Sequence, residues 1–243
     1  FFDTERPGLL GLRGFDCEGN NPKYPFRALV KLYAKLGLHR YNLLEFFNMK
    51  IGGGASSYYI TLAGCAPDSD LQQSFQVIVA EERLGLLDVK VSMPRPRGED
   101  EDEDEDVVEV VLPDWPSETD FSDRKRFRML KESELRSNDW ITLYLELALA
   151  AHDRTLTDLD LLELEIVQVA IEDVETPRKG AKTAVYYISY KDVAKARKGE
   201  PVDRKAVVRR VLDEPSGELA LVGEEIALVG EEEEISGELE TYC

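Results

Sequence analysis

Eight consecutive acidic residues, 99–106, divide this chain into two parts and set the strongest limit on how it can fold. Side chains of like charge repel one another and cannot be buried together, so this run must stay in solvent. It follows Pro94-Arg95-Pro96-Arg97-Gly98, where the prolines exclude regular structure. We therefore predict that 99–106 is an exposed linker or long loop between two folded segments.

The first segment has a helical pattern followed by strand patterns. Apolar residues three and four positions apart in 26–38 predict an amphipathic helix, with Pro25 at its start and Gly37 at its end. Turns are expected at Gly52-Gly53-Gly54 and at Leu84-Gly85. Four strands are predicted around these turns, at 43–51, 57–64, 73–82 and 86–93. This order is one helix followed by an antiparallel meander.

The second segment repeats this order after a proline-bounded loop at 112–116. Ser137 or Asn138 can cap its helix. The predicted apolar face of that helix contains Trp140, Leu143, Tyr144, Leu147, Ala148 and Ala151. Four strands are predicted at 162–174, 184–191, 206–212 and 218–222. The chain is thus expected to be α+β, with a helix packed on an antiparallel sheet in two tandem units. The alternative is that both meanders join into one continuous sheet.

These patterns give five predicted regions. They are an N-terminal extension (1–22), a first unit (23–98), the acidic linker or loop (99–106), a second unit (107–223) and an acidic C-terminal tail (224–243). A local duplication lies at the end, where 219–225 is repeated almost unchanged as 226–232. Two copies are too few for a solenoid, so the second copy is predicted to be an edge strand or a tail.

The charge of the chain argues against binding to nucleic acids or to anionic membranes. The net charge is −19, and −11 remains when the acidic run is left out. One small basic cluster, Arg124-Lys125-Arg126 with Arg128, is interpreted as a solvated patch, with an import signal as the alternative. We expect a protein partner, and the oligomeric state stays open.

Cysteine and histidine usage gives no reactive pattern. Cys17, Cys65 and Cys243 are widely spaced without a CxxC pair, which favours a reducing compartment. Residues 1–10 contain charges and a proline where a signal peptide would be apolar, and no stretch reaches the roughly 18 to 20 apolar residues of a membrane span. We expect a cytoplasmic or nuclear protein. His39 and His152 lack a local partner pattern, although either could act as a base if the fold brought a nucleophile within reach, and for His152 a structural role at a helix C-terminus is predicted.

Motifs for catalysis and cofactor binding are missing from the sequence. Ala55-Ser56-Ser57 follows the glycines where a phosphate-binding loop needs Lys and Ser or Thr. Asp68-Ser69-Asp70 lacks the remaining ligands of a calcium loop. Leucine spacing in 159–166 is similar to that of a nuclear export signal, although such spacing is also typical of a buried element. We therefore expect no enzyme activity, no cofactor, and no catalytic, cofactor-binding or metal-binding residue.

Several stretches resemble a plant family named after male-sterility-five and expanded in crucifers. The resemblance covers roughly residues 20–195. It rests on Ser57-Tyr58-Tyr59-Ile60-Thr61-Leu62-Ala63, 75–79, 112–116, 138–146, 164–170 and 172–175. It implies a cystatin- or monellin-like fold and an association of some members with male fertility, meiosis or embryo development. It supplies no catalytic residue.

The same resemblance raises inhibition of papain-like cysteine proteases as an alternative function. Cystatins insert a Gln-x-Val-x-Gly hairpin, in which glycine lets the backbone approach the protease closely. This chain has Gln76-Val77-Ile78-Val79-Ala80 and Gln168-Val169-Ala170-Ile171-Glu172, and both lack the glycine. The leading hypothesis is therefore a non-enzymatic protein that binds other proteins through exposed strand edges and its acidic arm.

Overall fold

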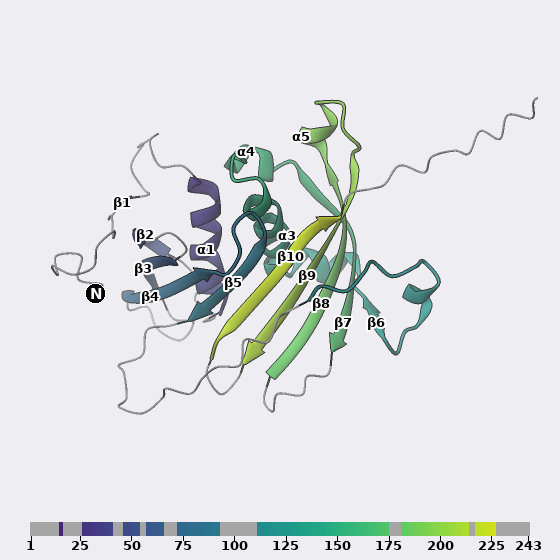
Figure 1. Cartoon of the computed structure of the whole chain (residues 1–243), viewed down its shortest axis with the longest axis horizontal. Coiled ribbons are helices and arrows are strands. Elements are labelled where there is room, and N and C mark those ends of the chain that lie inside the picture. The colour runs from purple at the N-terminus through teal and green to yellow at the C-terminus, as the bar shows by residue number, and fades with distance from the viewer. Residues whose placement is uncertain are drawn as a thin grey trace, which may run out of the picture.

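The protein is a mixed fold of helices and one antiparallel sheet (Figure 1). This computed structural model describes residues 15–16, 26–40, 46–53, 57–65, 72–92, 111–174, 181–213 and 217–226. Its helices are α1 (Arg27–Arg40), α2 (Glu132–Arg136), α3 (Asp139–His152), α4 (Asp158–Leu161) and α5 (Val193–Ala196), with a 3-10 turn at Asp120–Ser122. None of the described helices is both long enough and apolar enough to cross a membrane.

Ten strands form a single sheet in the order β1-β2-β3-β4-β5-β10-β9-β8-β7-β6. They are β1 (Phe15–Asp16), β2 (Phe46–Gly53), β3 (Ser57–Cys65), β4 (Gln72–Glu81), β5 (Leu87–Ser92), β6 (Phe127–Met129), β7 (Leu164–Val174), β8 (Ala181–Asp192), β9 (Asp203–Asp213) and β10 (Leu219–Ile226). All neighbouring pairs are antiparallel. The predicted class, helices on an antiparallel sheet, is confirmed, while the likeness of each half to a cystatin stays a prediction.

The two predicted meanders meet edge to edge in the middle of this sheet. β10, from the end of the chain, pairs with β5, with Leu219 opposite Val91 and Gly223 opposite Leu87. We call the β5–β10 junction, together with the helix contacts beside it, the seam. The elements before residue 100 are the first half, and those after it are the second half. Of the two arrangements left open by the sequence, the structure has the continuous sheet.

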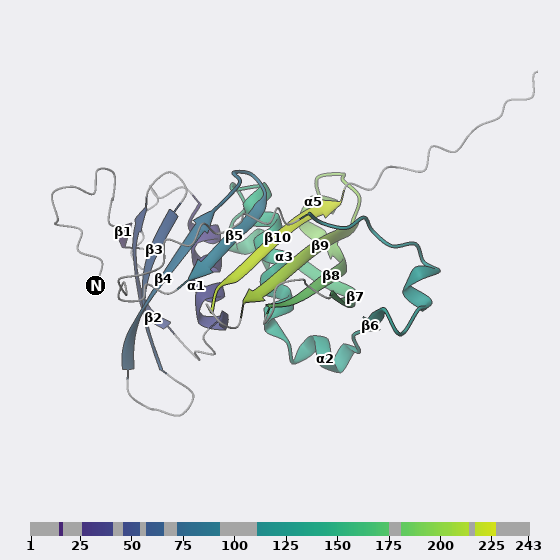
Figure 2. The ribbon, with the colours of Figure 1, turned by 60° about the horizontal axis from the view of Figure 1, so that its bottom comes forward.

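α1 and α3 lie against each other on the same face of the sheet (Figure 2). Both have 14 residues, and buried side chains surround each of them almost completely. On α3 the predicted apolar face is correct for Leu143, Tyr144 and Leu147, but Ile141, Leu145 and Leu149 are buried as well. These additional residues are buried because α3 packs against the sheet on one side and against α1 on another.

Three predictions about the first half are wrong in detail. Gly37 lies inside α1 instead of ending it, and it leaves room for Val77, since a Cβ there would come within 2.8 Å of a Val77 side-chain carbon. Phe26 precedes the helix with a φ of 71°, so it is absent from the apolar face. Gly52 and Gly53 continue β2. The turn at Leu84-Gly85 is confirmed, and Gly85 has a φ of 82°.

Strand boundaries in the second half differ from the predictions for local reasons. Residues 162–163 are not in β7, because they form the turn after α4, which Thr157 caps by accepting a hydrogen bond from the amide of Asp160. β10 continues to Ile226, past the start of the predicted tail at 224. β1 lies within the predicted extension 1–22. The acidic run 99–106 and the second copy of the duplication from residue 227 onward lie outside the described residues.

A second layer covers the outer face of the sheet in the second half. Trp115 packs edge-on against Tyr187, with ring centroids 5.7 Å apart, and Phe121 contacts both rings. Lys205 of β9 places its Nζ 5.0 Å from the centre of the Trp115 ring. The proline-bounded loop of the sequence is therefore the start of a covering segment, 111–127, which we call the strap.

Candidate interaction surface

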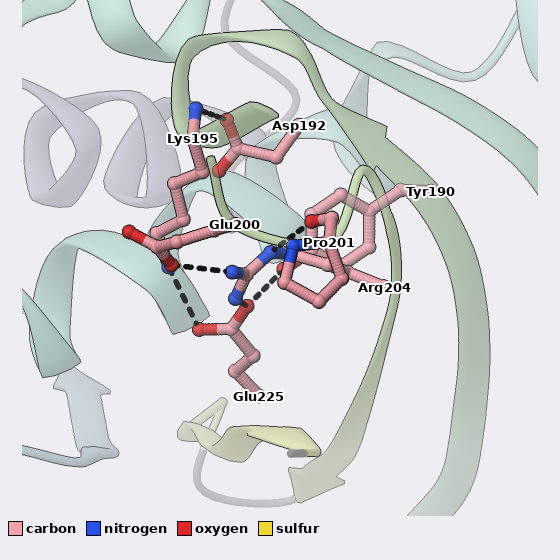
Figure 3. Close-up of polar contacts among 7 residues, drawn as sticks. All are labelled: Tyr190, Asp192, Lys195, Glu200, Pro201, Arg204 and Glu225. Atoms are coloured by element: carbon pink, nitrogen blue, oxygen red, sulfur yellow. Dashed lines mark hydrogen bonds and ion pairs between the residues drawn. The ribbon is translucent and has the colours of Figure 1, made fainter. Parts of the chain in front are cut away.

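Two clusters of charged side chains and one sheet edge are the strongest candidates for function. The first cluster surrounds Glu225 of β10 (Figure 3). The carboxylate of Glu225 accepts hydrogen bonds from Arg204, from the Tyr190 hydroxyl at 2.8 Å and from the Lys195 ammonium at 3.1 Å. Arg204 also pairs with Glu200 at 2.6 Å, and its side chain is 14% exposed. The cluster ties β8, β9 and β10 to α5.

Every charge in this cluster has a partner of opposite sign. Burial alone favours neutral Glu225, but hydrogen bonds from Arg204 and Tyr190 outweigh it, so the pKa of Glu225 lies below its usual range. Burial, followed by the nearby Glu225 charge, raises the pKa of Tyr190, which keeps its hydroxyl protonated as a donor. These mutual contacts favour a role in holding the strand ends together.

The second cluster lies at the seam and joins the two halves. Glu81 of β4 accepts hydrogen bonds from the Tyr33 hydroxyl of α1 at 2.6 Å and from Arg154, after α3, at 2.9 Å. The Glu81 side chain is only 2% exposed and that of Arg154 is 14% exposed. Burial works against the charge of Arg154, but the hydrogen bond to Glu81 raises its pKa. Burial and then Glu81 raise the pKa of Tyr33. This is a buried ion pair between segments 73 residues apart.

The third candidate is the outer edge of β7, which β6 covers only in part. β6 pairs with Ala170, Ile171 and Glu172, and the amide of Leu130 donates to the Val169 carbonyl at 2.9 Å. Residues 164–168 of β7 pair with β8 alone in the described part of the chain. We call 164–168 the open edge.

A bulge and exposed side chains mark the open edge. The register with β8 shifts between Ile166 and Gln168, so Val167 is the extra residue, and its side chain is 51% exposed. Just before the edge, Leu162 is 78% exposed. A strand edge with free backbone groups and apolar side chains can accept a further strand from another chain.

The structure separates the residues that the sequence singled out. His39 packs against both Trp140 and Tyr144, with ring centroids 6.0 and 5.8 Å away, and its Nε2 is 3.3 Å from the Tyr144 hydroxyl. His152 is exposed at the end of α3, far along the helix from Trp140. The two histidines therefore form no common site, and His39 belongs to the contact between α1 and α3.

Other predicted features are divided between described and undescribed residues. Cys17, Cys243 and 68–70 lie outside the described residues, as does the side chain of Cys65. The described residues contain no group of three or more His, Cys, Asp or Glu side chains that could hold a metal ion. In the basic cluster, Arg126 pairs with Glu172 and Arg128 with Glu134.

The leucine-rich stretch 159–166 is partly buried and partly exposed. Leu161 is 8% exposed, and Leu164 and Ile166 pack against the core, as predicted for a buried element. Leu159 and Leu162 are 73% and 78% exposed, so the prediction of a buried element is wrong for these two. Because three of the five apolar side chains face the core, the folded chain does not present the whole leucine pattern.

Sequence reasoning missed both charge clusters. Glu81 and Arg154 are isolated in the sequence, and the partners of Glu225 lie 21 to 35 residues away. One weak signal was present, since Glu225 lies an even number of positions after Leu219 and Leu221, but it fell in the predicted tail 224–243 and not in the predicted strand 218–222. No local sequence pattern indicates which residues pair with Glu81 or Glu225.

Comparisons with known proteins agree on one group of relatives. A family model described as Protein MS5 matches residues 112–221. UPF0725 protein EMB2204 from Arabidopsis thaliana is 54% identical over 237 residues, covering 89% of this chain and 72% of that protein. UPF0725 protein At1g02770 from Arabidopsis thaliana is 42% identical over 248 residues, covering 92% and 78%. The crystal structure of MS5 from Brassica napus has 28% sequence identity and a TM-score of 0.61, covering 82% of this chain and 98% of that one.

Proposed function

The chain belongs to the plant family described as Protein MS5, and from that premise we propose that it is a non-enzymatic protein that binds another protein at the open edge of its sheet. Cytoplasm or nucleus is the proposed location. The association of the resembled family with male fertility, meiosis and embryo development is the proposed biological setting. The observation that carries this proposal is the uncovered stretch 164–168 of β7.

The open edge offers the two features that strand addition requires, namely backbone hydrogen-bonding groups and apolar side chains next to them. Its backbone groups on the outer side pair with no described strand, so an extended segment of a partner can form main-chain hydrogen bonds there. Val167 and Leu162 add exposed apolar surface beside it. The three-residue β6 covers the next part of β7, so the partner strand would continue the position of β6 in the sheet.

The charge of the chain indicates the kind of partner. A net charge of −19 favours encounter with a basic or neutral segment and disfavours acidic partners. If the acidic run contributes, replacing 99–106 by Gln and Asn should weaken association and flatten its salt dependence. Unchanged affinity in that variant would show that the acidic run does not contribute to binding, and the open edge would then be the proposed contact alone.

The charge clusters support a structural role more than catalysis. Glu225 and Glu81 each pair with a cation, and each also accepts a hydrogen bond from a tyrosine whose pKa is raised. A general base needs a free lone pair within reach of a nucleophile. Oε1 of Glu81 accepts both of its hydrogen bonds, and its Oε2, although unpaired among the described residues, is shielded from solvent, so these groups instead fix the positions of strands and helices.

A pair of matched substitutions tests the edge. Val167→Lys places a charge on the open edge, where lysine disfavours strand addition. Val111→Lys makes the same change on the strap, whose backbone contacts β9, at a side chain that is 64% exposed. Both variants and the parent chain are used for affinity capture from floral-bud extract at low and moderate salt, with mass spectrometry. We expect one stoichiometric partner to be lost with Val167→Lys alone. Equal capture by both variants would exclude the open edge.

Protease inhibition is the second candidate, and it has less support in the fold. The segment 76–80 lies within β4, between β3 and β5, and 168–172 lies within β7. Neither is a loop that could enter a protease cleft. Titration of papain with the purified chain discriminates the two functions, because an inhibitor would abolish activity at a stoichiometric ratio.

A further inference from the structure

A hollow of about 410 Å³ opens between the start of α1 and the loop after α3. Residues 26–28 form one wall and 154–158 form the other, so each half of the protein contributes one side. Apolar side chains, including Phe26 and Leu156, make up much of the lining. A solvent-open hollow of this size can hold part of a small organic molecule.

Arg27 gives the hollow an unbalanced positive charge. Two cations, Arg27 and Arg154, line it together with the Asp158 carboxylate, and among the described residues Arg154 pairs with Glu81 and Asp158 with Lys31. Arg27 forms no ion pair with any described residue, and its Nε is shielded from solvent without a hydrogen-bond partner. The first turn of α1 also carries no acidic side chain that would offset the positive end of the helix.

Arg154 presents a second donor of the same kind. Its Nη2 donates to Glu81, but its Nε is shielded from solvent and has no hydrogen-bond partner. Buried guanidinium N–H groups are normally satisfied, and each of these two arginines has one that is not, so an acceptor in the hollow pairs with them only after the side chains turn toward it. A carboxylate or phosphate is the acceptor that matches the planar fork of arginine.

Phe26 positions an aromatic ring at the hollow. Its φ of 71° is rare for a bulky residue, and such strained positions cluster at binding sites. The ring lies 5.2 Å from the guanidinium carbon of Arg154 and is partly exposed. An apolar or aromatic body bound in the hollow can pack against this ring while its anionic group faces Arg27.

We propose that this hollow binds a small organic anion, a carboxylate or phosphate joined to an apolar or aromatic body. Arg27 holds the anionic group, and Phe26 contacts the body. This site is independent of strand addition at the open edge, so either function can hold without the other.

The test is a titration of the full chain followed by amide chemical shifts. The probes are 4-phenylbutyrate, phenyl phosphate and inorganic phosphate, which separate the type of anion from the need for an apolar body. We expect saturable shifts at 26–28 and 154–157 with one or both aromatic probes and weaker binding of inorganic phosphate. Equal binding of inorganic and phenyl phosphate would overturn the role assigned to the apolar body.

Matched variants identify the anion-binding group. Arg27→Gln is expected to weaken binding of the aromatic anions about tenfold, the usual scale for one charge-assisted hydrogen bond. Lys35→Gln, the same change on the exposed side of the same helix, should alter binding less than about twofold. Arg27→Lys preserves the charge but not the fork, and it serves as the second variant if Arg27→Gln perturbs folding. Equal effects of the Arg27 and Lys35 variants, or no saturable shift with either aromatic probe, would overturn the proposal.

Discussion

The two halves of this protein share one order of elements but differ in how their sheets are covered. In the first half, β5 alternates between buried and partly exposed residues, as a strand with one covered face does. In the second half, residues 183–188 of β8 are all buried. The helices cover one face of β8 and the strap covers the other.

This difference shows why the halves depend on each other unequally. The second half has two apolar clusters, one on each face of its sheet, and the smaller one is closed by Phe127 and Trp115. The described part of the first half contributes to the helix-side cluster only. Its helix α1 is buried almost all round because α3 covers it. We therefore expect the first half to be more sensitive to the seam, and the second half to depend also on the strap.

The largest effect is expected from breaking the buried ion pair at the seam. Glu81→Gln leaves the Arg154 charge without a counter-ion in a site that is 14% exposed, and should lower the free energy of unfolding by about 3 to 5 kcal/mol. Lys31→Gln removes a more exposed ion pair across the seam, whose Asp158 side chain is 55% exposed, and should cost about 1 kcal/mol or less. Urea denaturation measures both. A similar decrease in the free energy of unfolding in both variants would show that burial does not make the Glu81–Arg154 pair more important than the Lys31–Asp158 pair.

Truncating the strap should come next and should act on the second half. Trp115→Ala removes the ring that packs on Tyr187, and because Trp115 is only partly buried we expect a loss of about 2 to 3 kcal/mol. Hydrogen exchange should show β8 and β9 losing more protection than β4 and β5. Leu84→Ala, at a side chain that is 75% exposed, is the control and should stay within about 0.5 kcal/mol. Uniform loss of protection would contradict the unequal dependence.

A smaller effect, confined to the first half, is expected from Gly37→Ala. Alanine is the better helix residue, but its Cβ would meet Val77 at 2.8 Å, so overpacking should leave a net loss of about 1 to 2 kcal/mol. Val77→Ala should relieve the contact, so the double variant should be more stable than the sum of the single changes predicts. Additive free energies of unfolding would show that Val77 is not the cause.

The smallest expected effect is on the loss of stability at acidic pH that the Glu225 cluster of the second half causes. Because its folded-state pKa is lowered, Glu225 stabilises the fold above its unfolded pKa of about 4.3, and this contribution is lost as the pH falls through the folded value. Glu225→Gln should therefore flatten the loss of stability between roughly pH 5 and pH 3. Denaturation across this range measures the slope. Glu82→Gln, at an exposed carboxylate, is the control, and an identical slope for the parent and Glu225→Gln would refute the assignment.

The sequence by itself determined α1, α3 and eight of the ten described strands, together with part of their buried faces, but not β1, β6 or the three short helices. Alternation in Leu87-Asp88-Val89-Lys90-Val91 predicts a strand covered on one face, and the run Ala184-Val185-Tyr186-Tyr187-Ile188 is typical of a strand covered on both. The apolar spacing of Leu143 and Leu147 placed α3 correctly. Local periodicity contains this information because burial repeats with the geometry of the backbone.

The partners of these elements were decided only by the tertiary structure. The pairing of β10 with β5 joins residues more than 120 positions apart, and the pairing of Glu81 with Arg154 spans 73. Gly37 looked like a helix end, yet it lies inside α1, where the absence of a side chain makes room for Val77 of a distant strand. Periodicity specifies that a face is buried but not what buries it, since the covering element is chosen by shape and charge complementarity across the whole chain.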